Sequence, residues 1–257
     1  MTFDALTSPL PMTSSPDLRP LLRERVCVDC GCTLTGVLGL CGDCAEVRQW
    51  REVEGRRLAE QKVRQSRWQA LCPPLYRHTD WAHADLAPGL VALVQSWQPA
   101  PGRSLLLTGG TGLGKTRAAF ALLQRVHDSG RSVYALHAGD AWDHGSHLQG
   151  LASAVRLQYH EDPRVAQTAA HCLHRARTCS LLLLDDVGKE RASGQTGQLS
   201  EAVGEALFGL IEHRLVHALP LILTTNAPGA TLQHRLGPDR GAPLLRRLLE
   251  SCTVVGG

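Results

Sequence analysis

The stretch SLLLTGGTGLGKTRAA, residues 104–119, decides the fold class. Residues 104–109 are a short apolar run ending in glycine, which is typical of a buried strand, and the residues after Thr116 have the spacing of a helix. Between them, residues 109–116 match the pattern G-x-x-x-x-G-K-[ST] in full. Glycines let such a loop turn its backbone N–H groups inward, where they surround phosphate oxygens together with the start of the next helix. The stretch therefore predicts a site for nucleotide phosphates.

The cofactor expected at this loop is ATP with Mg²⁺. The residues predicted to bind it are Gly109, Gly110, Thr111, Gly112, Leu113, Gly114, Lys115, Thr116, Arg117 and Asp185. Lys115 places a cation against the β- and γ-phosphates, and Thr116 offers a hydroxyl to Mg²⁺. The alternative, a glycine-rich turn that binds nothing, fits poorly because a strand precedes the loop and a helix follows it.

A second apolar strand, LLLLDD at 181–186, ends in two acids. Asp185 is predicted to hold Mg²⁺ together with Thr116, and Asp186 to orient or deprotonate the attacking water. Many ATPases of this kind carry Glu at the second position, so the shorter Asp186 favours slow hydrolysis or an adjusted geometry. Glu190 is a fallback acid for activating the water. The alternative is a strand end that carries two ordinary surface carboxylates.

Another apolar strand, LILTTN at 221–226, ends in polar residues. Because the carboxyl ends of parallel strands gather around the ligand, Asn226 is predicted to lie near the γ-phosphate and to hydrogen-bond the attacking water. Its alternative role is to cap the turn after the strand. Among the arginines that follow, one is expected to stabilise transition-state charge across a subunit boundary. Arg240 is the first candidate and Arg247 the second.

Strands and helices alternate over most of the chain, which predicts an α/β fold with a parallel sheet covered on both faces. The expected strands are 104–109, 131–138, 180–186 and 219–226, with a final apolar stretch at 252–255. The expected helices are 86–97, 117–130, 148–159, 164–176 and 199–218. Ser200 is the expected cap of the last of these helices.

Five of the nine cysteines lie between Cys27 and Cys44. Cys27-x-x-Cys30 and Cys41-x-x-Cys44 are two pairs separated by ten residues, and two such turns complete a tetrahedral Zn²⁺ site. A segment this small has little core of its own, so metal binding would supply much of its folding energy. Cys32 is an alternative ligand to Cys30. An iron–sulfur site and free thiols are the alternative interpretations.

The 257 residues with a net charge of +3 fit one ordinary domain and a smaller module. The expected organisation is a disordered tail at 1–20, a zinc-binding module at 21–45, a linker helix at 46–70 and an ATPase domain at 71–257. The linker helix is either a solvated spacer or a docking or DNA-tracking helix. No secretory signal is present and no apolar run approaches the ~20 residues that span a bilayer, so we expect a cytoplasmic protein with no membrane partner.

Taken in order, these motifs resemble the AAA+ ATPases of the DnaC/IstB-like helicase-loader group. The segments that carry the resemblance are CPPLYRHTDW (72–81), LLLTGGTGLGKTRAA (105–119), LLLLDDVGKE (181–190), EALFGLIEHRLVHALPLILTTN (205–226) and DRGAPLLRRLLESC (239–252). The resemblance covers about residues 70–257. It implies that Asp186 is the hydrolytic acid, Asn226 the polar sensor and Arg240 the finger that acts on a neighbouring subunit.

The resemblance also implies a role in replication. Members of the group bind the hexameric replicative helicase and help to place it on single-stranded DNA under ATP control. A trans-acting arginine implies self-association through the ATP site, and some loaders resemble this chain in carrying an N-terminal zinc module that contacts the helicase. The alternatives are a transposition helper ATPase of the IstB kind, an ATP-gated adaptor with negligible hydrolysis, and a small-molecule kinase.

Overall fold

The computed structural model describes residues 25–34, 39–139, 150–188, 192–193 and 198–256. The predicted tail at 1–20, the start of the helix predicted at 148–159, and Glu190 lie outside these residues. The chain divides into two compact units, Met1–Gln61 and Lys62–Gly257, which are described separately. The division falls inside one long helix, α1 (Gly42–Leu71).

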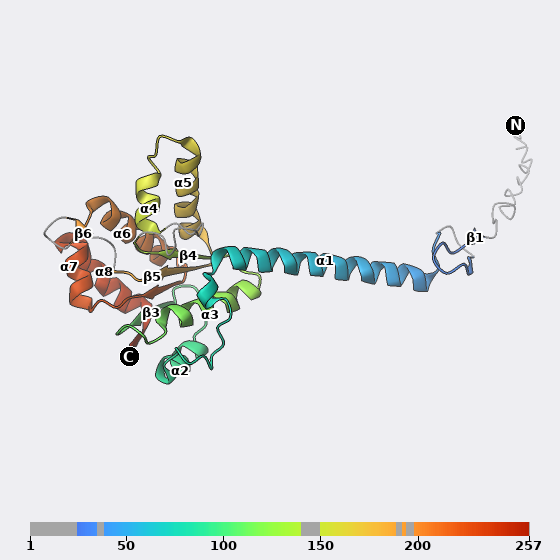
Figure 1. The fold of residues 1–257 in the computed structure, drawn as a ribbon, viewed down its shortest axis with the longest axis horizontal. Helices are drawn as coiled ribbons and strands as arrows, with labels where there is room; N and C mark the ends of the chain where they lie inside the picture. The colour runs from blue at the N-terminus through green and yellow to red at the C-terminus, as the bar shows by residue number, and fades with distance from the viewer. Residues whose placement is uncertain (1–24, 35–38, 140–149, 189–191, 194–197, 257) are drawn as a thin grey trace, which may run out of the picture. The chain divides into compact units, whose positions relative to one another are not determined.

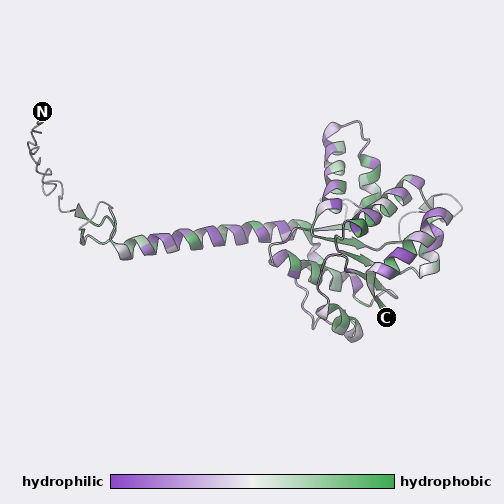
Figure 2. Ribbon diagram, turned by 180° about the vertical axis from the view of Figure 1, so that it is seen from behind, coloured by the Kyte–Doolittle hydropathy of each residue, from purple (hydrophilic) through white to green (hydrophobic). Residues whose placement is uncertain are grey.

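The first unit is a small cysteine-rich hairpin joined to the start of α1. Strands β1 (Arg25–Val26) and β2 (Thr33–Leu34) pair antiparallel, and Gly31 makes the turn between them with φ at +74°. Helix α1 begins inside the second cysteine pair, so that Cys44 lies in its first turn. Figure 2 shows the helix α1 as mostly hydrophilic. Of the residues of α1 that the structure describes, Trp68 and Leu71 are the buried ones, and both belong to the second unit. This part of the chain therefore has very little hydrophobic core.

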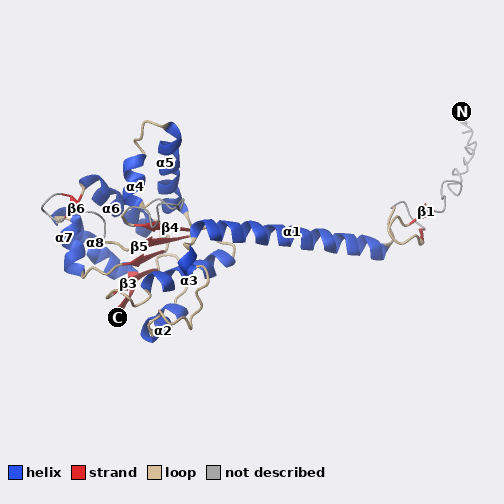
Figure 3. Cartoon of the chain, in the orientation of Figure 1, coloured by secondary structure: helices blue, strands red, loops and turns tan. Residues whose placement is uncertain are grey.

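The second unit is built on a parallel sheet of five strands in the order β4-β5-β8-β3-β9 (Figure 3). Its strands are β3 (Ser104–Thr108), β4 (Val133–His137), β5 (Leu181–Asp185), β8 (Leu221–Thr224) and β9 (Cys252–Gly256). The residues of β5 and β8 are all buried, because helices cover both faces of the sheet. This matches the sheet that the alternation of strands and helices predicts.

Helices lie on both sides of this sheet, with α2 and α3 on one side and α4, α5 and α6 on the other (Figure 1). The position of α3 opposite α4, α5 and α6 follows from right-handed crossovers, because the chain moves one way along the sheet from β3 to β4 and the opposite way afterwards. The helices are α2 (Pro88–Ser96), α3 (Lys115–Asp128), α4 (Leu151–Leu157), α5 (Pro163–Thr178), α6 (Glu201–Val216), α7 (Gly229–Leu236) and α8 (Pro238–Ser251).

Several details differ from the sequence-based expectations. Ser200 does occupy the N-cap position of α6, but its side chain makes no capping hydrogen bond to the described residues. No sequence pattern indicated the paired strands β1 and β2, the 3-10 turn η2 (Pro74–Tyr76) or the paired strands β6 (Ala192–Ser193) and β7 (Gln198–Leu199). Strands of two residues are too short for a period of two to be recognised.

Arg214 of α6 joins three elements of the second unit from inside the core. Its side chain is fully buried and donates to the carbonyl oxygens of Ala176 (2.7 Å), Cys179 (3.0 Å) and Pro220 (2.7 Å). These carbonyls lie at the end of α5 and before β5 and β8. Burial lowers the pKa of the Arg214 guanidinium. The side chain thus aligns the starts of the two strands whose far ends carry the candidate site.

The strand order brings the predicted motifs together. Strand β8 lies between β3 and β5, and all three run parallel, so their carboxyl ends meet at one edge of the sheet. The phosphate-binding loop follows β3, the paired acids end β5, and the polar residues end β8. Segments more than a hundred residues apart in the sequence therefore face the same space.

Candidate functional site

The loop after β3 has a backbone that glycine makes possible. Gly109, Gly112 and Gly114 have φ angles of 126°, 90° and 78°. Gly114 is also packed closely, because a Cβ atom there would lie 2.3 Å from the carbonyl oxygen of Asp85. An alanine at this position requires the loop or the segment around Asp85 to move. The conformation that turns the loop's N–H groups inward is therefore tied to a second segment of the chain.

Lys115 sits inside the curve of this loop. The residue is only 6% exposed, and Nζ donates to the carbonyl oxygens of Gly109 (3.0 Å) and Gly110 (2.7 Å). The helix α3 begins at Lys115, so its free N–H groups and the ammonium group favour negative charge at the same place. This is the electrostatic requirement for binding the phosphates of a nucleotide.

Asp185 is held by two hydroxyl groups at the floor of the site. Thr116 Oγ1 donates to Asp185 Oδ1 at 2.9 Å, and Thr224 Oγ1 donates to the same oxygen at 2.6 Å. Asp185 is almost completely buried, at 1% exposure of the residue. A hydroxyl and a carboxylate in contact are hard oxygen ligands of the kind that Mg²⁺ prefers. The two residues predicted to share Mg²⁺ are therefore brought together.

Asp186 adopts an unusual backbone conformation that points it into the same space. Its φ angle is +57°, in the left-handed region where Asp is one of the few tolerated non-glycine residues. The Asp186 N–H donates to Thr224 Oγ1 at 2.8 Å, which anchors this conformation. Asn226 Nδ2 lies 3.4 Å from Asp186 Oδ1. The predicted hydrolytic acid and the predicted sensor thus lie side by side, and Thr224, which sequence reasoning missed, links both acids.

Lys115, Thr116, Asp186 and Asn226 line one cavity of about 380 Å³. Its lining residues are Leu75, Tyr76, Asp85, Thr111, Gly112, Gly114, Lys115, Thr116, Arg117, Asp186 and Asn226. Leu75, Tyr76 and Asp85 were not predicted as site residues, although two of them lie within the segment 72–81 that carries the resemblance. Tyr76 stacks on Phe120 of α3, with ring centroids 5.1 Å apart and an interplanar angle of 11°. This segment supplies an apolar wall next to the phosphate loop.

Arg117 lines the cavity, but its guanidinium group contacts residues 75–85, which contain the apolar wall and are called the wall segment below. It donates to Leu75 O (3.0 Å), Thr79 Oγ1 (3.2 Å) and Asp85 Oδ2 (3.0 Å). The residue is only 6% exposed. Its contacts hold the segment 75–85 against the first turn of α3, whereas a direct contact with ATP stays a prediction.

His137 is a further polar residue at this edge that sequence reasoning missed. It ends β4 and pairs in parallel register with Asp185. Its Nε2 lies 3.6 Å from Asp186 Oδ2, and its Nδ1 accepts the N–H of Gly139 at 3.1 Å. A single histidine at a strand end has no sequence pattern that marks it, and only the strand order places it beside the acids.

The candidate arginines lie away from this cavity within the chain. Arg240 Nη2 is 3.5 Å from Glu201 Oε1, and Arg240 lines a separate cavity of about 210 Å³ between the start of α6 and the α7–α8 turn. Arg247 pairs with Glu212. Neither residue lines the nucleotide cavity of its own chain. The assignment of Arg240 as a finger that acts on a neighbouring subunit therefore stays a prediction.

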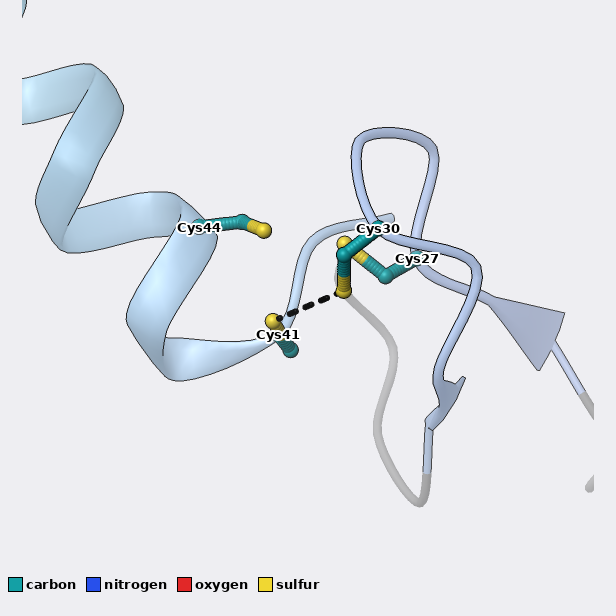
Figure 4. Close-up of side chains that lie close together, drawn as sticks. All are labelled: Cys27, Cys30, Cys41 and Cys44. Carbon is teal, nitrogen blue, oxygen red and sulfur yellow. Dashed lines mark hydrogen bonds between the residues drawn. The ribbon is translucent and has the colours of Figure 1, made fainter.

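The four predicted zinc ligands converge in the first unit (Figure 4). The sulfur atoms of Cys27, Cys30, Cys41 and Cys44 all lie within 4.8 Å of one another. Cys30 Sγ and Cys41 Sγ are 3.6 Å apart, close to the ~3.8 Å that tetrahedral geometry gives for Zn–S bonds of ~2.3 Å. Backbone N–H groups of Cys41 and Cys30 lower the pKa of the Cys27 thiol to about 6. The donor set fits a tetrahedral metal such as Zn²⁺.

Residues around the four thiols support this arrangement. Arg48 of α1 forms two hydrogen bonds with the carboxylate of Asp29, one of them from Nε to Oδ2 at 2.7 Å. The pair ties the loop of the first cysteine pair to the helix that carries Cys44, and Arg48 lowers the pKa of Asp29. Cys32 is exposed and its thiol interacts with those of Cys30 and Cys41, but it is not among the four residues whose sulfur atoms all lie within 4.8 Å of one another. The structure thus brings together Cys30, and not Cys32, with the other three ligands.

Three features meet at one edge of the parallel sheet. They are the glycine-rich loop around Lys115, the buried Asp185 carboxylate beside the Thr116 hydroxyl, and the Asp186 carboxylate. Together they define the second unit as a P-loop nucleotide-binding domain. No family model matches the sequence, and no curated protein matches it. Among solved structures, DnaI is similar with a TM-score of 0.51 and 17% identity, covering 72% of this chain and 95% of that chain. The DnaC helicase loader has a TM-score of 0.49 and 20% identity, covering 72% and 99%. AMPPCP-bound DnaA from Aquifex aeolicus has a TM-score of 0.49 and 16% identity, covering 72% and 50%.

The likeness to DnaI shows that this chain shares the fold of that protein over 72% of its length. It confirms the predicted fold class, a P-loop α/β core, and the cysteine cluster is consistent with the predicted zinc module. None of the helices in the described part of the chain is both long and apolar enough to cross a membrane.

Proposed function

We propose that this chain is an ATP-hydrolysing helicase loader. It binds ATP and Mg²⁺ in the second unit and uses the nucleotide to control the placement of a hexameric replicative helicase on single-stranded DNA. The observation that carries the proposal is the meeting of the phosphate loop, Asp185 and Asp186, and Asn226 at one sheet edge, in a fold shared with DnaI.

The phosphate end of the nucleotide lies against the loop in this proposal. The inward N–H groups and Lys115 bind the β- and γ-phosphates, and Lys115 exchanges its bonds to Gly109 and Gly110 for bonds to phosphate oxygens. Thr116 and Asp185 hold Mg²⁺, which when bound neutralises negative charge on the β- and γ-phosphates. The apolar wall at Leu75 and Tyr76 takes the base end of the nucleotide.

Hydrolysis requires a water molecule held in line with the γ-phosphate. Asp186 orients this water and takes its proton as the water oxygen bonds to phosphorus and the bond to the bridging oxygen breaks, giving ADP and phosphate. Asn226 lies beside Asp186 and donates a hydrogen bond to the water or to a γ-phosphate oxygen. The short Asp186 side chain favours slow turnover, which suits a protein that uses ATP as a timer.

The first unit is proposed to be a zinc-dependent contact for the helicase. Its fold depends on metal because it has almost no apolar core, whereas several apolar side chains are exposed, including Val26, Val28, Val47 and Trp50. Exposed large apolar residues on so small a unit favour a protein partner. Self-association is proposed to place Arg240 of one subunit at the nucleotide of the next, after its contact with Glu201 is released.

The proposal is tested by a loading assay with the replicative helicase of the same source and circular single-stranded DNA. The full chain is expected to raise the number of helicase–DNA complexes in the presence of ATP, and Lys115→Ala is expected to lose this effect. A chain that fails to bind the helicase, or that loads it equally well without nucleotide, would contradict the proposal. Binding to a transposase in place of the helicase would support the transposition-helper alternative.

One observation favours a second candidate, an ATP-gated adaptor with negligible hydrolysis. Asp186 is a short acid whose carboxylate already faces Asn226 at 3.4 Å. If ATP binds tightly and loading proceeds equally with a non-hydrolysable analogue, the adaptor function is correct. Loading that requires hydrolysis would reject it.

A further inference from the structure

We propose that Arg117 is a positioning residue for the base end of ATP, and that it acts by holding the wall segment against α3 and not by contacting phosphate. The inference rests on the proposed binding of ATP. It gives a role to a cation that follows the phosphate-binding pattern, since that pattern ends at Thr116. A cation in the first turn of the helix after such a loop would ordinarily be assigned to the phosphates. The contacts of Arg117 assign it to the wall segment.

The guanidinium group of Arg117 is used by three acceptors of the wall segment. Nη1 donates to Leu75 O (3.0 Å) and to Thr79 Oγ1 (3.2 Å), and Nη2 donates to Asp85 Oδ2 (3.0 Å). The Arg117 side chain is 8% exposed, so water competes little for these donors. Because the guanidinium is planar and presents its donors in a fixed fork, the three bonds fix the distance between the wall segment and α3.

Ring contacts add to this attachment. Tyr76 stacks on Phe120 of α3, and the Arg117 guanidinium carbon lies 5.5 Å from the centroid of the Tyr76 ring, within the range of a cation–π contact. Leu75, the neighbour of Tyr76, lines the cavity and is 66% exposed. Ligand sites commonly combine such apolar surface with a few fixed polar groups. The wall that Arg117 holds is therefore suited to the base of a nucleotide.

The two ends of the wall segment are held in different ways. At one end, a Cβ on Gly114 would lie 2.3 Å from Asp85 O, so the backbone there packs directly against the phosphate loop. At the other end, Arg117 holds the backbone of the apolar wall through Leu75 O. Loss of the guanidinium therefore leaves the segment packed at Asp85 but removes the bond that fixes Leu75 and the adjacent Tyr76.

The consequence is a separation between the two ends of the nucleotide. In the proposed function the loop N–H groups and Lys115 bind the phosphates, whereas the base depends on the wall segment. A displaced wall lowers the affinity for ATP and leaves the affinity for a bare polyphosphate nearly unchanged. Asp186 acts at the γ-phosphate, so the loss appears in KM and not in kcat, as for binding that is equal in the ground state and the transition state.

The test measures the Kd for ATP and for inorganic tripolyphosphate, both with Mg²⁺, by isothermal titration calorimetry on the full chain. Arg117→Met removes the guanidinium and keeps an unbranched side chain. We expect the Kd for ATP to rise about 10- to 100-fold, the Kd for tripolyphosphate to change less than about 2-fold, and kcat to stay within about 3-fold of the wild type. Arg117→Lys is expected to recover little of the ATP affinity, because an ammonium group does not reproduce the fork.

Two further variants complete the series. Asp85→Asn weakens one bond at a carboxylate that is 59% exposed, so it keeps the test decisive if Arg117→Met does not fold. We expect it to raise the Kd for ATP about 2- to 5-fold without raising that for tripolyphosphate. Arg125→Met is the matched control, because Arg125 also ties a segment to α3, through Gln95 O (2.8 Å) and Trp97 O, but is not among the described residues that line the nucleotide cavity. It is expected to keep the wild-type Kd for both probes.

An equal rise in the Kd for ATP and for tripolyphosphate in Arg117→Met would overturn the proposal, because Arg117 would then contact phosphate or support the whole site. Unchanged ATP affinity in that variant, or full recovery in Arg117→Lys, would also overturn it. A wild-type chain that binds neither ATP nor tripolyphosphate would reject the proposed function itself, and this series separates that result from failure of the Arg117 role.

Discussion

Alanine substitutions at Gly110, Gly112 and Gly114 separate backbone strain from steric clash within one loop. Gly110 has an ordinary φ and nothing within 4 Å of an added Cβ, Gly112 has φ at +90° and the same open space, and Gly114 has φ at +78° with a clash. Left-handed backbone costs a non-glycine residue about 1–2 kcal/mol, and forced overpacking costs about 1–3 kcal/mol. We therefore expect Gly110→Ala to lower the free energy of unfolding by less than about 0.5 kcal/mol and Gly112→Ala by about 1–2 kcal/mol. Gly114→Ala is expected to lower it by about 2–5 kcal/mol, because backbone strain and overpacking add.

The Gly114 value follows from the atoms that the new methyl group meets. The Cβ would lie 2.3 Å from Asp85 O, 3.0 Å from Leu86 Cδ2 and 3.1 Å from Asp85 C. The first and last of these are backbone atoms, which cannot rotate away as a side chain does, so the wall segment itself must shift. The assay is urea unfolding without nucleotide, followed by fluorescence, to which Trp68 and Trp97 contribute from buried positions in this unit.

Two outcomes of this unfolding series would contradict the reasoning. Equal losses at all three positions would mean that neither φ nor the contact with Asp85 matters. A loss at Gly112 as large as that at Gly114 would reject the steric part of the argument, and ATP affinity measured on the same variants would then show whether the wall segment is coupled to the loop.

Three further results are expected from the same structure. Metal analysis should give about one zinc per chain, lost in Cys44→Ser and retained in Cys32→Ser, because only the former belongs to the four converging thiols; retention in both would reject the ligand set. Thr224→Val should lower the free energy of unfolding by about 1–3 kcal/mol and ATP turnover at least about 10-fold, because the Thr224 hydroxyl contacts both the Asp185 carboxylate and the Asp186 N–H. Turnover equal to that of the wild type would contradict this linking role. Arg214→Met should lower the free energy of unfolding in urea by about 3–5 kcal/mol, because it removes the guanidinium group that donates to three buried carbonyl oxygens; a change below about 1 kcal/mol would show that these bonds are not formed.

The sequence predicts the core of the nucleotide site because its motifs are contiguous and fixed in spacing. Lys115, Thr116 and Asp185 are identified by the residues around them, and their joint position follows from the rule that parallel strands end at the same edge. The zinc ligands are predicted for the same reason, since two short pairs define a tetrahedral set.

The residues that sequence reasoning missed act through contacts between distant segments. Asp85 packs against Gly114 across about thirty residues, and His137 reaches Asp186 only because β4 and β5 are neighbours. Thr224 was visible in the motif TTN, but a hydroxyl at a strand end does not reveal that it bridges two acids. Such roles depend on strand order and on packing, neither of which one sequence specifies by its local pattern.

ATP turnover by the purified full chain, with and without single-stranded DNA and with Lys115→Ala as the control, tests the central claim most directly. The account predicts Mg²⁺-dependent release of phosphate that single-stranded DNA stimulates and that Lys115→Ala abolishes, because the ammonium group sits inside the phosphate loop. Turnover that persists in Lys115→Ala, or the absence of both turnover and ATP binding in the wild type, would contradict it.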